Sequence, residues 1–344
     1  MAGTFRFSFG PWNIHEGSDP FGPNVRDSIP FNHKLEQYKA LGFDGVQFHD
    51  DDAVPAMNSL KPAQIIREAE AVKKKLDDHG LVAEFVAPRM WEDPRTMDGG
   101  YTANDPAARA YAKDRTERTV DIAKALGTDL IVLWLAREGT YLREAKDSKV
   151  AADRILAAMN AIFTYGDNVR IAVEPKPNEP MDHTYIPTVG HALALGARSL
   201  KPGKVGVVIE SAHSILAGLD PSDEMGFALS CNGLFSVHLN DQNGLKFDQD
   251  KSFGSVDLRR AFNQVRILDK HDYGQNGEWV GLDVKAMRTQ KADVATRHLS
   301  NSREIFLDLL EISRSMDENK IEGFIAERDY EALDLYIMKR LLGK

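Results

Sequence analysis

Side chains able to bind a metal ion or a sugar recur where the predicted β-strands of this sequence end. The run DGVQFH ends in a histidine, RIAVEPK contains a glutamate and a lysine, and VGVVIESAH contains a glutamate and a histidine. LFSVHLN and WVGLDVK continue the pattern. The residues concerned are His49, Glu174, Lys176, Glu210, His213, His238, Asp283 and Lys285. Because the carboxyl ends of parallel strands in a barrel meet around one pocket, this series predicts a metal-dependent enzyme.

Four of these residues have the chemistry of ligands to one cation. Glu174, Glu210, His238 and Asp283 stand at the ends of the fifth, sixth, seventh and eighth predicted strands. Carboxylate oxygens and imidazole nitrogens from four adjacent strands can surround one divalent ion and leave positions open for substrate oxygens. We therefore expect a first metal site here.

A second group of ligands overlaps the first. Glu210 and His213 are spaced E-x-x-H, so they lie on one face if the chain becomes helical after the sixth strand. Asp248 and Asp250 follow in KFDQD, where an extended chain would point both carboxylates the same way. Glu210 would then bridge two cations, which can together clamp adjacent oxygens of a polyol.

Each residue alone also has a purely structural interpretation. A single histidine at a strand end is more often a hydrogen-bonded core residue than a ligand, and two aspartates in a loop commonly stabilise a turn. A series of eight such residues on successive strand ends is improbable by chance, so the pattern favours the metal site.

The elements that must position these residues alternate between short strands and longer amphipathic helices. Helical patterns such as AQIIREAEAVKKKLDDHG end in glycine, as at Gly42, Gly80 and Gly127, which is typical of a left-handed helix cap. The strand cores LIVLWL and VGVVI are apolar throughout, as in parallel strands covered by helices. The fold class is α/β, a (β/α)8 barrel with a short C-terminal helical extension. We expect strands near 5–12, 44–49, 81–87, 128–135, 170–175, 205–210, 234–240 and 278–284.

The length of 344 residues fits one barrel and an extension. We expect a catalytic barrel domain over residues 1–317, closed by a helix near 298–317, and a C-terminal extension over 318–344. There the acidic segment SMDENKIEGF leads into a terminal helix. Its apolar residues should pack on the barrel or on a partner subunit; they are Leu333, Leu335, Ile337, Leu341 and Leu342.

The composition argues against several other classes of protein. A net charge of −9 and the lack of a basic cluster argue against a nucleic-acid surface. No signal pattern and no run of about eighteen apolar residues is evident, so we expect no membrane segment and a cytoplasmic location. The single cysteine, Cys231, excludes an intrachain disulfide and is expected to be a small buried packing residue.

An ordered series of motifs resembles the D-xylose (glucose) isomerase family. The resemblance runs from SFGPW to about residue 290 and returns in the tail DYEALDLYIMKRLLGK. It implies a metal-dependent intramolecular oxidoreductase that interconverts an aldose and a ketose, such as D-xylose and D-xylulose, by a hydride shift. It also implies two divalent cations per chain, Mn, Co or Mg. The motifs are FHDDD at 48–52, VLWLAREG at 132–139, EPKPNEP at 174–180, HLNDQNG with KFDQD at 238–250, and DVKAMRT at 283–289.

The resemblance also implies catalytic roles. His49 with Asp52 would open the sugar ring, Asp52 fixing the imidazole tautomer so that the other nitrogen meets the ring oxygen. Lys176 would polarise the substrate carbonyl. Asp250, with the second metal, would activate the water that moves the hydroxyl proton.

Substrate contacts follow from the same resemblance. Trp12, Trp91 and Trp134 would form an aromatic wall that excludes water, although core packing is the commoner role for any one tryptophan. Lys285 resembles a lysine tied to the metal carboxylates. Phe21 matches the aromatic residue that the family inserts into a neighbouring subunit's site, which implies a homodimer or homotetramer.

Two departures from the family bear on specificity. His238 stands where the family has aspartate, which removes one negative charge and should shift the preference from Mg toward Mn, Co or Zn. A histidine there is similar to the rhamnose isomerases and the ketose 3-epimerases. The segment VAPRMWEDPRT also differs from the family and places Arg89 and Glu92, by expectation, near the far end of the sugar.

Several alternatives remain open. A relative on the same barrel could act on a different sugar or sugar derivative, as a rhamnose-type isomerase or a ketose 3-epimerase. Lys176 favours the hydride-shift isomerase, since proton-transfer 3-epimerases rely on a pair of glutamates. A DNA-repair enzyme would need three clustered zinc sites and a basic face, and a non-catalytic sugar-binding protein would not need the second set of ligands.

Overall fold

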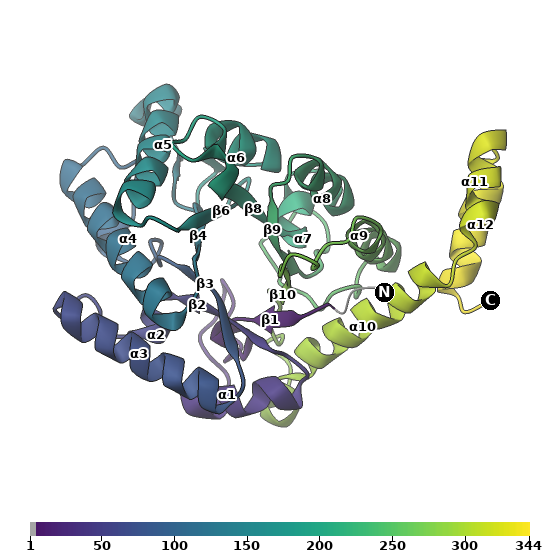
Figure 1. The fold of residues 1–344 in the computed structure, drawn as a ribbon, viewed down its shortest axis with the longest axis horizontal. Helices are drawn as coiled ribbons and strands as arrows, with labels where there is room; N and C mark the ends of the chain where they lie inside the picture. The colour runs from purple at the N-terminus through teal and green to yellow at the C-terminus, as the bar shows by residue number, and fades with distance from the viewer. Residues whose placement is uncertain (1–4) are drawn as a thin grey trace.

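A closed barrel of eight parallel strands forms the body of the molecule (Figure 1). The computed structural model describes residues 5–344, so the first four residues of the predicted barrel domain lie outside it. The strands pair in the order β1-β10-β9-β8-β6-β4-β3-β2, which confirms the predicted (β/α)8 barrel. Their bounds are β1 Phe7–Phe9, β2 Gly45–His49, β3 Val82–Ala87, β4 Leu130–Trp134, β6 Arg170–Glu174, β8 Val205–Glu210, β9 Leu234–Leu239 and β10 Trp279–Leu282.

The register of these strands brings their last residues to one level. Trp134 of β4 is opposite Glu174 of β6, and Glu210 of β8 is opposite His238 of β9. Every residue of β8 is buried, as expected for a parallel strand covered by helices. The rigid sheet therefore fixes the site residues relative to one another.

Helices surround the barrel, and their ends follow local sequence signals. Asp105 and Asp220 cap helices that begin with proline, each carboxylate accepting a backbone N–H. The three expected glycine caps have positive φ, 83° at Gly42, 65° at Gly80 and 85° at Gly127. The surrounding helices are α1 Phe31–Ala40, α3 Pro62–Asp78, α4 Pro106–Leu126, α5 Ser148–Tyr165, α6 Val189–Gly196, α8 Pro221–Ser230, α9 Leu258–Lys270 and α10 Arg297–Arg314.

Short elements occupy the loops between strands and helices. Two follow strand ends directly, α2 (Asp50–Ala53) after β2 and α7 (Ser211–Leu216) after β8. β5 (Gly139–Thr140) and β7 (His183–Thr184) form a separate antiparallel pair. The 3-10 turns are η1 Pro11–Asn13, η2 Pro94–Thr96, η3 Arg143–Ala145, η4 Pro202–Lys204 and η5 Ala292–Val294.

The C-terminal extension is a helical hairpin that projects beyond α10 (Figure 1). The acidic segment that leads into the terminal helix forms a helix of its own, α11 (Glu318–Glu327), whose first turn Asp317 caps. In α12 (Tyr330–Leu341) three of the five expected packing residues lie against the core: Leu333, Ile337 and Leu341. Leu335 and Leu342 do not pack on the core and are 55% and 66% exposed. The domain boundary at residue 317 stays a prediction.

The structure also tests the expected burial of Cys231 and shows whether any helix could span a membrane. Cys231 is exposed, because α8 ends at Ser230 and the cysteine lies beyond the buried face; the buried assignment is wrong. Among the described residues, no helix has both the length and the apolar character needed to cross a bilayer.

Candidate metal centre

The carboxyl ends of the strands surround a cavity of about 370 Å³. Of the fifteen residues that the sequence singles out for the site, thirteen line it, and only Asp52 and Phe21 do not. The thirteen are Trp12, His49, Trp91, Trp134, Glu174, Lys176, Glu210, His213, His238, Asp248, Asp250, Asp283 and Lys285.

Three groups of ligand-type side chains meet in this cavity, and Glu210 belongs to all of them. Its carboxylate is grouped with Glu174 and His213, with His238 and Asp283, and with Asp248 and Asp250. Within each group one potential ligand atom of every residue lies within 4.8 Å of the others. α7 is helical, as the E-x-x-H spacing requires, and places His213 Nε2 3.3 Å from Glu210.

Buried polar atoms without hydrogen-bond partners test whether these groups fit a cation. Both ring nitrogens of His238, Nδ1 of His213 and Oδ1 of Asp248 are buried and accept or donate no hydrogen bond. A buried polar atom left unsatisfied typically costs about 1–3 kcal/mol. Four such atoms beside a cluster of carboxylates fit ligands of divalent cations.

The electrostatics of the cluster point the same way. Burial and the neighbouring carboxylates of Asp248 and Asp283 raise the pKa of Glu210 well above its usual range. Burial, with the charge of Asp248, raises the pKa of Asp250 to about 8. Burial alone would raise the pKa of Glu174, but His238, His213 and other neighbours together lower it to about 2. So many carboxyls cannot all be ionised together unless positive charge joins them.

Two asparagines that the sequence reading missed hold the ligands in place. Asn13 Nδ2 donates to Asp283 Oδ1 at 2.7 Å, beside the Trp12 Nε1 donor at 3.0 Å. Asn240 Nδ2 donates to Glu210 Oε1 at 2.8 Å and to the carbonyl of Asp283 at 3.0 Å. Asn240 stands two residues after His238, so period-two alternation could have placed it on the same side of the strand.

Two lysines neutralise the second group. Lys176 Nζ donates to Asp248 Oδ2 at 2.8 Å and lies 3.4 Å from Glu179, while Lys285 Nζ lies 2.8 Å from Asp250. Although burial alone would lower the pKa of Lys176, the charges of Asp248 and Glu210 raise it, so its side chain is an ammonium ion. Glu179, also missed by the sequence reading, accepts the backbone N–H of Asp248 at 3.0 Å.

The KFDQD loop is not extended as expected. Asp250 has a φ of 47°, in the left-handed region that aspartate tolerates better than most residues. The loop folds back here, since Asp241 and Lys251 form a β-bridge and Lys285 N donates to the Asp250 carbonyl at 2.9 Å. This turn, rather than strand alternation, brings both aspartates to Glu210.

His49, at the end of β2, lines the cavity but belongs to none of the ligand groups. Asp52 lies behind it, one turn into α2, with Oδ2 2.9 Å from His49 Nδ1 and 3.0 Å from its backbone nitrogen. Arg89, expected near the far end of the sugar, lines the same cavity and is a third member of this group, since its Nη2 lies 2.7 Å from the same Nδ1. It reaches His49 because β3 pairs directly with β2 and ends in the loop that carries it.

Aromatic rings also line the cavity, beside His49. Trp12 lies against His49 with ring centroids 4.1 Å apart, and Trp91 meets Trp134 edge to face at 4.4 Å. Phe21 is 83% exposed, and its nearest aromatic contact is Phe247 at 5.8 Å. Its expected role in a neighbouring subunit stays a prediction.

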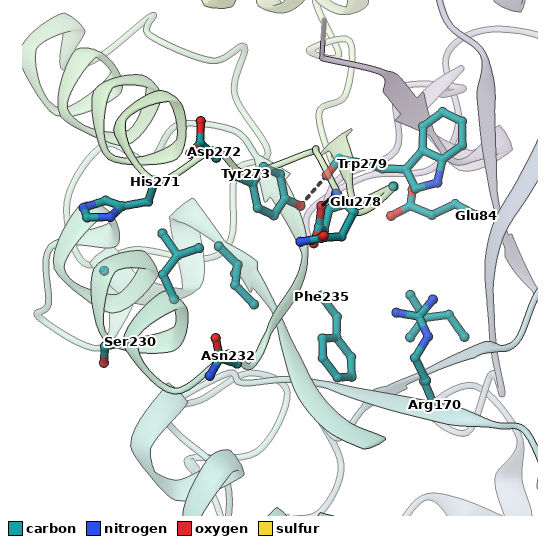
Figure 2. Close-up of a pocket in the computed structure, with 16 residues that line it drawn as sticks. Glu84, Arg170, Ser230, Asn232, Phe235, His271, Asp272, Tyr273, Glu278 and Trp279 are labelled. Atoms are coloured by element: carbon teal, nitrogen blue, oxygen red, sulfur yellow. Dashed lines mark hydrogen bonds between the residues drawn. The ribbon is translucent and has the colours of Figure 1, made fainter. Parts of the chain in front are cut away.

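A second cavity, of about 500 Å³, lies at the amino ends of the strands (Figure 2). The first residues of four strands line it, Leu130, Arg170, Leu234 and Trp279, and none of the expected site residues does. Its buried carboxyl, Glu84, accepts hydrogen bonds from Ser8 and Ser236, and burial raises its pKa. None of the three ligand groups found among residues 5–344 lies here.

Comparisons with known proteins agree with the fold. Residues 35–304 match the family model described as xylose isomerase-like TIM barrel. Similar solved structures include a D-tagatose 3-epimerase-like protein, with 13% identity, a TM-score of 0.63 and coverage of 90% of this chain and 98% of that one. The 3-keto-D-glucoside 4-epimerase of E. coli has 15% identity and a TM-score of 0.62, covering 88% and 99%.

The IolI protein with a bound zinc atom has 14% identity and a TM-score of 0.62, covering 90% of this chain and 100% of that one. Identities this low show the common fold only. The match of residues 35–304 confirms the resemblance for the broader xylose isomerase-like TIM barrel family, whereas the closer resemblance to the D-xylose isomerases stays a prediction. The chain belongs to the xylose isomerase-like TIM barrel family.

Proposed function

We propose that this protein is a divalent-metal-dependent sugar isomerase that interconverts an aldose and a ketose by a hydride shift. D-xylose and D-xylulose, or a related pentose or hexose pair, are the proposed substrates. The observation that carries the proposal is a buried ammonium, Lys176, beside two overlapping groups of cation ligands that share Glu210.

The ligand groups divide into two proposed cation sites. Glu174, Glu210, His238 and Asp283 would hold the first cation. Glu210, His213, Asp248 and Asp250 would hold the second. When bound, two such ions polarise neighbouring sugar oxygens and stabilise negative charge on them.

The chain's own side chains supply the remaining steps. Lys176 is charged and donor-only, so it suits a carbonyl oxygen that gains negative charge as hydride arrives. Asp250 is the carboxyl that we assign to the hydroxyl proton. Trp91 and Trp134 cover the cavity wall with apolar surface, which keeps water from the migrating hydride.

A second candidate function is a ketose 3-epimerase, which exchanges a carbon-bound proton instead. Glu174 and Glu210 favour it, because both are buried and both lie within 3.6 Å of the His213 ring nitrogens. Burial and charge move their pKa values in opposite directions, as an acid–base pair requires. Two of the similar structures are described as epimerases or epimerase-like.

Isotope labelling separates the two functions. The metal-loaded protein is incubated with a panel of aldoses and ketoses, and interconversion is followed by NMR. With deuterium at C2 of the aldose, a hydride shift retains the label in the ketose, and loss of that label to solvent would contradict the hydride shift. A ketose 3-epimerase would instead invert C3 of a ketose and lose a deuterium placed at C3 to solvent, without forming an aldose.

The matched variant is Lys176→Met, which keeps the length of the side chain and removes its charge. We expect turnover to fall by about 100- to 1,000-fold, the range for removing a transition-state donor. Bound metal, measured by elemental analysis, should stay at the wild-type level. A variant that retains activity would remove Lys176 from the mechanism.

A further inference from the structure

Two neighbours with opposite hydrogen-bonding needs compete for Nδ1 of His49. Arg89 Nη2 lies 2.7 Å from this nitrogen, and Asp52 Oδ2 lies 2.9 Å from it. A guanidinium group can only donate and an ionised carboxylate can only accept. A neutral imidazole nitrogen is either a donor or an acceptor, so it satisfies one neighbour and not both.

Arg89 cannot turn away, because each of its side-chain nitrogens has a partner. Nε donates to Asp51 at 2.7 Å, Nη1 to Glu92 at 3.2 Å, and Nη2 to Asp52 Oδ1 at 3.1 Å as well as contacting His49. Its side chain is only 16% exposed. Although burial alone would lower the pKa of Arg89, the charges of Asp52 and Asp51 raise it, so the group remains a donor.

A hydrogen bond to a buried carboxylate also fixes the backbone of Arg89. The Arg89 N–H donates to Asp50 Oδ1 at 3.2 Å, and Asp50 is fully buried in a two-pronged ion pair with Arg115, at 2.6 and 2.7 Å. Asp50 directly follows His49 in the chain. The same buried pair therefore fixes both Arg89 and His49.

The two tautomers of His49 can be compared donor by donor. With Nδ1 bare, both N–H groups of Arg89 Nη2 find an acceptor, in Nδ1 and in Asp52 Oδ1, and Asp52 Oδ2 still accepts the backbone N–H of His49 at 3.0 Å. The cost is one contact between that oxygen and the bare nitrogen. With Nδ1 protonated, two N–H groups face each other across 2.7 Å and a charged donor loses its acceptor. Either hydrogen bond to Nδ1 is charge-assisted, so the geometry decides between them. The contact with Arg89 is the shorter, at 2.7 Å against 2.9 Å, and Asp52 keeps other donors when Nδ1 is bare, so the bare form has the lower energy.

We propose that Arg89 is a positioning residue that holds His49 in the tautomer with a bare Nδ1 and a proton on Nε2. Nε2 makes no hydrogen bond with the described residues, and the ring lines the cavity beside Trp12 and Trp91. His49 then presents a neutral hydrogen-bond donor to the substrate and cannot accept a proton through Nε2. That the partner is the ring oxygen of a sugar rests on the proposed function; the tautomer does not.

The assignment replaces Asp52 with Arg89 as the residue that sets the tautomer. In the expectation from sequence, the carboxylate alone orients the imidazole. Here Asp52 orients Arg89 instead, and Arg89 determines which ring nitrogen carries the proton.

The test is the ¹⁵N NMR spectrum of the full-length protein with labelled histidine, loaded with Zn²⁺, which is diamagnetic. His49→Asn identifies the His49 signals by their loss. We expect a signal typical of an unprotonated ring nitrogen at Nδ1 and of a protonated one at Nε2. A proton on Nδ1 in the wild-type protein would overturn the proposal without the need for any variant.

Variants extend the test to the cause. Arg89→Met should reverse the tautomer, because Nδ1 can then donate to Asp52, whereas Arg89→Lys keeps a positive donor and should restore the wild-type pattern at least in part. Glu92→Gln is the control, since Glu92 is 63% exposed and contacts only Nη1. If Arg89→Met leaves Nδ1 bare, Arg89 does not set the tautomer and the proposal fails.

Activity provides an independent readout. In Arg89→Met, kcat/KM for a closed-ring sugar should fall roughly 100-fold, the lower end of what a positioned acid or base contributes, and less for an open-chain substrate. A wild-type protein with a bare Nδ1 and no isomerase activity would refute the proposed function and uphold the tautomer. The two claims therefore fail separately.

Discussion

Glu210 is the residue on which both proposed cation sites depend. It is buried, it belongs to all three ligand groups, and Asn240 holds one of its oxygens at 2.8 Å. Without a cation its carboxyl has a raised pKa, because it is buried and because Asp248, Asp283 and Glu174 surround it. A shared carboxylate of this kind couples the two sites, so occupation of one should favour ionisation of the ligand that both need.

At the residue scale, metal binding should release protons. Burial alone would lower the pKa of His238, but Glu174, Asp283 and Glu84 together raise it to about 9. At pH 7 the metal-free imidazole therefore carries a proton that a cation must displace. Affinity should therefore increase with pH, about tenfold per unit for each displaced proton, until about pH 9. Calorimetric titrations in buffers of different ionisation enthalpy count the protons, and binding without proton release would contradict the assignment.

His238 should also determine which metal is preferred. An imidazole in place of a carboxylate favours Mn or Co over Mg, which prefers oxygen ligands. His238→Asp should move the ratio of Mn to Mg affinity toward Mg by about tenfold or more. His15→Asn is the control, because His15 lines the same cavity outside the ligand groups. Equal shifts in both variants would mean that His238 is not a ligand.

At the scale of the element, the β2–α2 corner depends on one buried ion pair. Asp50 is fully buried and Arg115, from α4, is 3% exposed. Arg115→Met leaves a buried carboxylate without its partner, so the free energy of unfolding should fall by about 3–5 kcal/mol, measured by urea denaturation. Lys113→Ala, which breaks an exposed pair on the same helix, should cost less than about 1 kcal/mol. Similar losses in both variants would contradict the role of burial.

The sequence predicts the elements that have a regular hydrophobic pattern and misses the contacts that irregular loops make. Apolar runs such as VGVVI must be buried on both faces, so all eight strands could be placed, and with them Glu174, Glu210, His238 and Asp283. The left-handed turn at Asp250 and the contact of Arg89 with His49 arise from loops that no periodicity describes. Asn13 was missed for the same reason, since it reaches Asp283 through the fold of a short 3-10 turn.

At the scale of the whole molecule, the barrel separates two cavities with different chemistry. The cavity at the carboxyl ends gathers the ligand groups and the tryptophans. The one at the amino ends (Figure 2) has a single buried carboxyl, Glu84. Two serines hold this carboxyl by hydrogen bonds. Strand direction alone predicts this difference, because functional residues of such barrels lie at the carboxyl ends. The second cavity was not predicted, since none of the residues expected at the site lines it.

Assembly is also a property of the whole molecule, and we propose a homodimer or homotetramer in which Phe21 completes a neighbouring site. Phe21 is 83% exposed and does not line the cavity of its own chain. Phe21→Ala and Lys176→Met should each be impaired as pure proteins. Mixed after dissociation and reassembly, they should regain up to about one quarter of wild-type activity for random pairing in a dimer, since one site in each mixed dimer has both residues. No recovery, or a monomer by light scattering, would contradict the shared site.

The most direct test of the two-cation centre is a crystal structure of the wild-type protein loaded with Mn²⁺, with the ions located by anomalous scattering. We expect two ions per chain in the cavity at the carboxyl ends, bridged by Glu210. His238, Glu174 and Asp283 should complete one site, and the other should be completed by His213, Asp248 and Asp250. A single ion, a pair not bridged by Glu210, or ions bound elsewhere would contradict the centre on which the proposed function depends.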